Sequence, residues 1–331
     1  MTTSPESLVG RRNLLRTAGT ASLGAALLAA CGGNADTGDA AATPALTPTP
    51  TDAAASASPS APSVQDEIAL AAQAAGFDGP VDQTVIIATF ETLALPGQRM
   101  QFGVLDAERS PILGDPVQAA IVRASDFEVV AAATTPTFYG EDLGPRGVYV
   151  FSADLTSTGI HYLVVQTSAG NVGSGVLNII DPTTSQVPRT GDAFPLPPTP
   201  TVEDPQDLVE LCTREPDCSM HDLSLDEGPA LGKPMVVCIA TPKYCQTAVC
   251  GPVVDVVEAL KQERGSDDVS WFHIEVYVDA GNTPLPQVTE TWQLPSEPWT
   301  FLLHADGTVA DRFDGPVVPS LLAQAVDALL A

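Results

Sequence analysis

The segments KPMVVCIAT (233–241) and CQTAVCGPVVDVVEALKQERG (245–265) decide the fold of the C-terminal part of the chain. The first is an apolar run of strand length that does not alternate, which is typical of a buried parallel strand. The second has apolar residues at helical spacing, at Val249, Val253, Val256, Val257 and Leu260. Together they predict a strand that leads into a helix, with Cys245 and Cys250 at the junction.

More regular elements are expected downstream of this strand and helix. The sequence predicts strands over 269–278, 297–306 and 308–313 and a closing helix over 321–330. The pair Asp306-Gly307 favours a hairpin, because it suits the positive φ angles of a type I′ turn. The order strand, helix, strand, hairpin, helix indicates an α/β domain over 207–331.

The part of the chain before this domain has a different pattern. Seven short β-type runs with Pro and Gly turns lie at 83–90, 98–105, 117–123, 127–133, 147–155, 159–167 and 173–180. They predict an all-β sandwich over 66–181, similar to an immunoglobulin-like sandwich but without its inter-sheet disulfide, since no Cys lies between Cys31 and Cys212. Residues 182–206 contain seven Pro and predict an extended linker between the two domains.

The N-terminus has the pattern of an export signal. The twin arginines Arg11 and Arg12 precede an apolar run over 17–30, which is shorter than the ~20 residues of a membrane-spanning helix. Residues 1–30 resemble a twin-arginine-pathway signal that ends in a bacterial lipobox. The resemblance implies cleavage before Cys31, lipidation of that residue, and a location at the cell membrane, lipid-anchored on its extracytoplasmic face.

Composition defines the tether and excludes one class of partner. Residues 31–65 are mostly Ala, Thr, Pro and Ser and contain no Lys or Arg, which predicts a disordered tether. The whole chain of 331 residues has 14 Lys and Arg against 41 Asp and Glu, a formal net charge of −27. Binding to nucleic acid requires clustered Lys and Arg residues that neutralise phosphates, so no nucleic-acid partner is expected.

The C-terminal domain resembles the thioredoxin-like family over roughly 208–331. Cys250-Gly251-Pro252 is similar to part of the family's Cys-Gly-Pro-Cys, and EPWTF (297–301) stands where the family keeps a cis-proline beside its cysteines. The segments FHIEVY and SEPWTF are shared with a group of exported thioredoxin-like lipoproteins. The resemblance implies Cys245, Cys250 and Pro298 as catalytic residues.

The cysteine spacing departs from the family pattern. The pair is C-x-x-x-x-C, whereas the family has C-x-x-C, and two alignments are open. In one, Cys250 occupies the position of the family's nucleophile. In the other, which we prefer, Cys245 opens the helix as the nucleophile and Cys250 resolves from the next turn. Positions five apart on a helix lie ~7.5 Å apart along its axis, so this bridge requires the first turn to unwind.

The other cysteines need separate assignments. Cys212 and Cys218 flank Pro216, and in an exported protein they predict a small disulfide-closed loop. Cys238 lies inside the apolar run and is expected to be an inert packed thiol. An alternative groups Cys218 and His221 with the cysteine pair as a copper site similar to that of SCO-type proteins.

These patterns favour one function and leave others open. We expect thiol–disulfide exchange through Cys245 and Cys250, with thiols of envelope proteins or a redox partner protein as partners, and no cofactor or metal is assigned. A redox-silent binding or scaffold lipoprotein with structural disulfides is the alternative. A peroxiredoxin-like peroxidase also stays open, although Pro242 stands where that class has an activating Thr.

Overall fold

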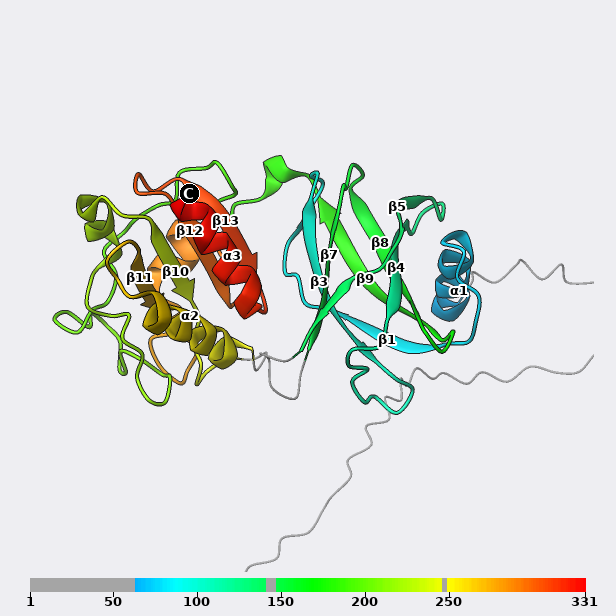
Figure 1. The fold of residues 1–331 in the computed structure, drawn as a ribbon, viewed down its shortest axis with the longest axis horizontal. Coiled ribbons are helices and arrows are strands. Elements are labelled where there is room, and N and C mark those ends of the chain that lie inside the picture. The colour runs from blue at the N-terminus through cyan, green and yellow to red at the C-terminus, as the bar shows by residue number, and fades with distance from the viewer. Residues whose placement is uncertain (1–62, 141–146, 246–248) are drawn as a thin grey trace, which may run out of the picture. The chain divides into compact units, whose positions relative to one another are not determined.

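The structure is a computed structural model that describes residues 63–140, 147–245 and 249–331 (Figure 1). The proposed signal over 1–30, the lipidation site Cys31 and nearly all of the tether lie outside the described residues. No helix within the described part of the chain is long and apolar enough to cross a membrane.

The described residues of the first folded part form one α-helix and one β-sheet. Its elements are α1 (Val64–Ala74), β1 (Val81–Ile87), β2 (Thr92–Leu93), β3 (Gln98–Leu105), β4 (Val117–Arg123), β5 (Val129–Thr134), β6 (Thr137–Tyr139), β7 (Val148–Ala153), β8 (Gly159–Thr167) and β9 (Val172–Ile180). The sheet follows the order β5-β4-β8-β9-β1-β3-β7-β6, with β2 paired to β9. Hydrogen bonding is therefore continuous through nine strands, because β1 pairs with both β3 and β9.

The core of this part joins strands from both halves of the sheet. Met100 and Phe102 of β3 pack in one cluster with Ile121 of β4 and Leu163 of β8, and all four are fully buried. The sheet must fold over on itself for these strands to share a core. Helix α1 packs on the other face of β4 and β8, where its Ala71 joins a second cluster.

The C-terminal part contains a four-stranded sheet in the order β11-β10-β12-β13. Its elements are β10 (Met235–Ile239), α2 (Cys250–Arg264), β11 (Ser270–Ile274), β12 (Trp299–Leu303), β13 (Val309–Asp314) and α3 (Pro319–Leu330), with short helical turns at Leu225–Leu231 and Gln287–Thr291. Strand β10 is parallel to β11 and antiparallel to β12. The chain order of strands and helices agrees with the sequence prediction.

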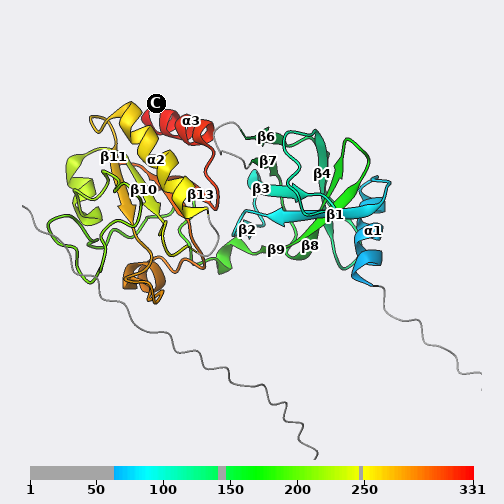
Figure 2. The ribbon, with the colours of Figure 1, turned by 90° about the horizontal axis from the view of Figure 1, so that it is seen from below.

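The two faces of this sheet are covered differently. Helices α2 and α3 lie side by side on one face (Figures 1 and 2). Val236 and Cys238 of β10 are buried on this face, in one hydrophobic cluster with residues of both helices. On the opposite face Val237 packs with Trp292, from the segment between β11 and β12.

The segment predicted as a linker over 182–206 is packed instead. After the short helical turn Pro182–Thr184, Val187 and Phe194 enter the core beside Trp292, and the Phe194 and Trp292 rings stack at 5.6 Å. A proline-rich sequence predicts an extended backbone, and an extended segment also suits packing along the face of a sheet. The prediction of a linker between the domains is therefore wrong for Val187 and Phe194, which belong to the core of the C-terminal part.

Candidate functional site

A disulfide joins Cys245 to Cys250, with Cα atoms 6.1 Å apart. Cys250 is the first residue of α2, and Cys245 lies in the segment before the helix. The expectation that Cys245 opens the helix is therefore wrong. Pro252 gives the reason, since a proline without an N–H is tolerated in the first helical turn but not further inside. With Cys245 outside the helix, the pair meets without any unwinding.

The two sulfur-bearing residues differ in exposure. Cys250 is fully buried among apolar residues of α2 and β10, whereas Cys245 is half-buried. Cys245 is therefore the more accessible end of the bond. The N–H groups and dipole at the start of a helix stabilise a thiolate, and Cys250 occupies that position on the 15-residue helix α2.

A buried carboxyl group faces the disulfide. One carboxylate oxygen of Glu297 and both sulfurs lie within 4.8 Å of one another. The Oε2 atom of Glu297 accepts a hydrogen bond from the Thr241 backbone N–H at 2.7 Å, whereas Oε1 has no hydrogen-bond partner within the described residues. Glu297 is only 6% exposed, and this burial raises the pKa of its carboxyl group to about 7. The carboxyl group can therefore hold or release a proton near neutral pH.

The next residue is the proline that the sequence singled out. The peptide bond between Glu297 and Pro298 is cis, and Pro298 directly precedes β12. Glu297 thus stands just before the first residue of β12, the strand that pairs with β10, and its carboxyl group lies beside the disulfide. Sequence reasoning named Pro298 and missed the role of Glu297, whose only sequence signal is its place beside that proline.

Two other titratable residues, Lys243 and Glu275, interact with groups outside the cysteine pair. The ammonium group of Lys243 forms an ion pair with Glu210 at 2.8 Å on the surface. Glu275, which directly follows β11, accepts hydrogen bonds from the Thr213 backbone N–H and side-chain hydroxyl. Glu297 is therefore the carboxyl group that the fold places beside the disulfide.

The expected disulfide between Cys212 and Cys218 is absent from the structure. Their sulfurs lie 3.8 Å apart, whereas a disulfide bond is about 2.05 Å long. Each sulfur instead lies near Nδ1 of His273, a residue 55 or more positions away in sequence. The spacing of Cys212 and Cys218 in the sequence correctly predicts that they are neighbours. It does not indicate that His273 lies beside them, because His273 is distant in sequence.

The copper grouping suggested by the sequence is also not formed. His221 and Cys218 lie with Cys212 and His273, and this group does not include Cys245 or Cys250. Cys238 is a separate, fully buried thiol on β10, and its burial raises its pKa to about 12. It therefore has the properties of an inert packed cysteine.

No protein-family model matches the chain, and no curated protein matches it. Among solved structures it is similar to StoA from Bacillus subtilis, with 13% identity and a TM-score of 0.24 over 29% of this chain and 83% of StoA.

Two larger structures also share similarity with parts of the chain. A metagenome-derived glycoside hydrolase family 9 endoglucanase has 21% identity and a TM-score of 0.21, over 29% of this chain and 18% of the enzyme. A Salmonella alpha-2-macroglobulin mutant has 19% identity and a TM-score of 0.23, over 38% of this chain and 8% of that protein.

Proposed function

We propose that this chain is a thioredoxin-like thiol–disulfide oxidoreductase that uses Cys245 and Cys250. The observation that carries the proposal is the buried carboxyl group of Glu297 beside a disulfide at the start of a helix. The sheet order of the C-terminal part adds support, as does the sequence resemblance to the thioredoxin-like family.

The exposure difference assigns a role to each cysteine. A thiolate of a partner dithiol attacks the accessible sulfur of Cys245, the S–S bond breaks, and Cys250 leaves as a thiolate stabilised by the start of α2. Protonated Glu297 then supplies a proton to Cys250. The second partner thiol attacks the mixed disulfide and Cys245 leaves, so that two electrons pass from the partner to the pair. In the reverse direction Cys245 is the nucleophile and Cys250 resolves.

A redox titration tests this proposal. The full chain carrying Cys31→Ser is equilibrated in dithiol buffers of graded potential, and mass spectrometry maps which cysteines are alkylated. We expect Cys245 and Cys250 to titrate together as one couple above about −300 mV, the level below which structural disulfides typically lie. A pair that resists reduction until the chain unfolds would instead indicate the redox-silent scaffold.

Trapping of a mixed disulfide provides the matched control. In the Cys250→Ser variant, residue 250 can no longer resolve a mixed disulfide on Cys245, so this disulfide should accumulate when a small disulfide substrate is added. The Cys245→Ser variant should form far less, because Cys250 is buried. Cys238→Ser leaves both sulfurs of the pair in place and should behave as the unmodified chain. Equal trapping by the two single variants would contradict the assigned roles.

The cellular setting is part of the same proposal. The twin arginines and Cys31 support an exported chain that is held to the extracytoplasmic face of the membrane by lipid on Cys31, with the tether as a spacer. We regard the β-rich part as an immunoglobulin-like module between the tether and the redox domain. Membrane fractionation of cells that express the native chain or Cys31→Ser tests the anchor: the variant should leave the membrane fraction.

A further inference from the structure

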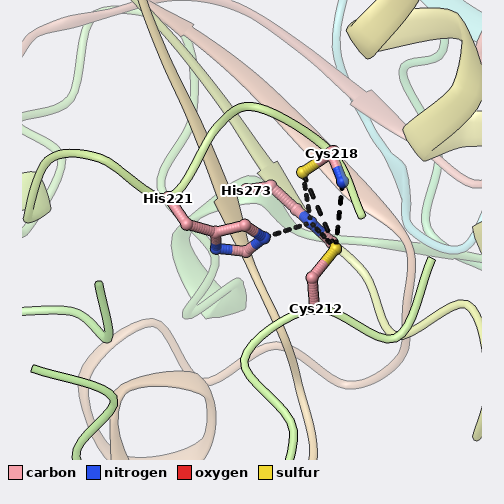
Figure 3. A group of neighbouring side chains, drawn as sticks. All are labelled: Cys212, Cys218, His221 and His273. Atoms are coloured by element: carbon pink, nitrogen blue, oxygen red, sulfur yellow. Dashed lines mark hydrogen bonds between the residues drawn. The ribbon is translucent and has the colours of Figure 1, made fainter. Parts of the chain in front are cut away.

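Four side chains from two distant parts of the sequence converge in the C-terminal part of the chain (Figure 3). Cys212, Cys218 and His221 come from one loop, and His273 comes from β11. One ligand atom of each lies within 4.8 Å of every other. All four are buried, with exposed fractions of 9% or less.

We propose that these four residues form a closed tetrahedral Zn²⁺ site. The site is independent of the disulfide, since neither Cys245 nor Cys250 belongs to it. Two thiolates and two imidazoles are a common donor set for structural zinc, and four protein ligands leave no open coordination position for a substrate.

The distances between the ligand atoms suit a single ion. Two thiolates bound about 2.3 Å from a tetrahedral Zn²⁺ lie about 3.8 Å apart, and thiolate and imidazole ligands lie about 3.5 Å apart. The sulfurs of Cys212 and Cys218 are 3.8 Å apart, and Nδ1 of His273 is 3.8 Å and 3.2 Å from them. Nε2 of His221 lies 3.1 Å from the same Nδ1 atom.

The hydrogen bonding of His273 fixes which nitrogen faces the cluster. Its Nε2 atom is 2.9 Å from the carbonyl oxygen of Ala240, so Nε2 carries the hydrogen and donates it. Nδ1 is then left with a lone pair that points at both sulfurs and at His221. A metal-bound histidine usually donates its other N–H to a carbonyl or carboxylate, and Ala240 fills that role here.

The loop that carries three of the ligands is held on both sides. On the β11 side, the His273 backbone N–H donates to the carbonyl oxygen of Met220, and Glu275 accepts from Thr213. On the α2 side, Glu258 accepts hydrogen bonds from the backbone N–H and hydroxyl of Ser219. The backbone N–H of Cys218 also points at the Cys212 sulfur, at 3.4 Å.

These contacts surround the ligands, as expected where a loop is ordered around an ion. Arg214, which lies in this loop between Cys212 and Cys218, adds an ion pair to Asp255 of α2 at 2.7 Å. A structural zinc ion holds its ligands together in the folded state, so its removal lowers stability. We therefore expect zinc to hold this loop against β11, which supplies the fourth ligand.

Metal analysis of the full chain tests the site. The Cys31→Ser chain is purified under reducing conditions, incubated with excess Zn²⁺, desalted and analysed by elemental mass spectrometry. We expect about one zinc per chain, and Co²⁺ loaded in its place should give the visible absorption of a tetrahedral thiolate site. Cys218→Ser and His221→Ala should lose the metal and the cobalt spectrum. Cys238→Ser and Cys250→Ser are the matched controls and should keep both.

The unfolding temperature provides a second test that does not depend on any ligand substitution, in case these variants fail to fold. A chelator should lower the unfolding temperature of the zinc-loaded Cys31→Ser chain, and returning Zn²⁺ should restore it. Three results would overturn the proposal: no zinc retained after loading, stoichiometric copper retained while zinc is not, or a Cys212–Cys218 disulfide found by peptide mapping of the chain isolated from its native compartment. The redox titration of Cys245 and Cys250 is scored separately, so the two proposals can fail independently.

Discussion

The carboxyl group of Glu297 and the buried sulfur of Cys250 lie within 4.8 Å of each other, although 47 positions separate the two residues in sequence. The contact depends on the antiparallel pairing of β12 with β10, because β10 leads to the cysteines and Glu297 stands just before β12. A proton on this carboxyl group favours a thiolate leaving at Cys250, whereas a negative charge there opposes it.

The exchange reaction should therefore depend on the protonation of Glu297. After correction for the thiolate fraction of the attacking dithiol, the rate of disulfide reduction should fall at least about tenfold as the pH rises through the pKa of Glu297, about 7. Glu297→Gln should remove this dependence. The rate is measured by rapid mixing with the dithiol, with alkylation used to quantify the reduced cysteines. Glu290→Gln, at an exposed position, is the matched control. The same pH profile in Glu297→Gln and in the native chain would exclude this role.

Glu297 should also make stability depend on pH. Its pKa is raised from 4.5 to about 7 in the folded state, so the folded chain binds this proton more tightly than the unfolded chain. Its contribution is fully present below about pH 4.5 and is lost as the pH rises to about 7, with an upper limit of about 3 kcal/mol. Urea unfolding across this range should show a smaller loss of stability in Glu297→Gln than in the native chain. Parallel curves for the two proteins would mean that the pKa of Glu297 is not raised.

Phe194 should be an essential part of the C-terminal core. Its ring stacks on Trp292 at 5.6 Å and lies 4.6 Å from the ring of Phe301. Phe194→Ala should lower the free energy of unfolding by about 3–5 kcal/mol, the usual cost of removing a buried aromatic ring. Denaturant unfolding measures the loss. Leu231→Ala, on an exposed residue, should change it by no more than about 0.5 kcal/mol. Similar small effects of both substitutions would show that residues 187–201 are not docked in solution.

Helix α1 should depend on its N-cap. The Ser63 hydroxyl accepts from the Asp66 backbone N–H, and the Asp66 carboxylate accepts from the Ser63 backbone N–H. Ser63→Ala should destabilise the helix by about 1 kcal/mol, whereas Ser63→Asp should retain the cap. Amide hydrogen exchange over 64–74 reads out this local effect. Unchanged protection in Ser63→Ala would show that packing of α1 on the sheet alone holds it.

The sequence predicted the order of elements better than their partners. Hydrophobic spacing predicted β10, α2 and the final hairpin and helix, because such patterns are local. Helix α1 was not predicted, although Ser63 and Asp66 stand at the spacing of a capping box. The preferred alignment with the thioredoxin-like family puts the start of α2 at Cys245, five residues before its first residue in the structure, Cys250.

The site was predictable only where its residues are close in sequence. Cys245 and Cys250 were identified as a pair, and Cys212 and Cys218 as neighbours. His273 and Glu297 reach these cysteines through strand pairing, and no local pattern indicates such contacts. A disulfide was therefore expected where the structure has two thiols and two histidines.

The packing of Val187 and Phe194 moves the functional start of the C-terminal unit upstream of its first regular strand. An expression fragment that begins at residue 207 would keep every strand of that sheet and every cysteine after Cys31, yet would expose the side chains that these two residues cover. A soluble, minimal redox fragment should therefore begin before Val187. In natural gene rearrangements, the proline-rich segment would have to be inherited together with the C-terminal unit.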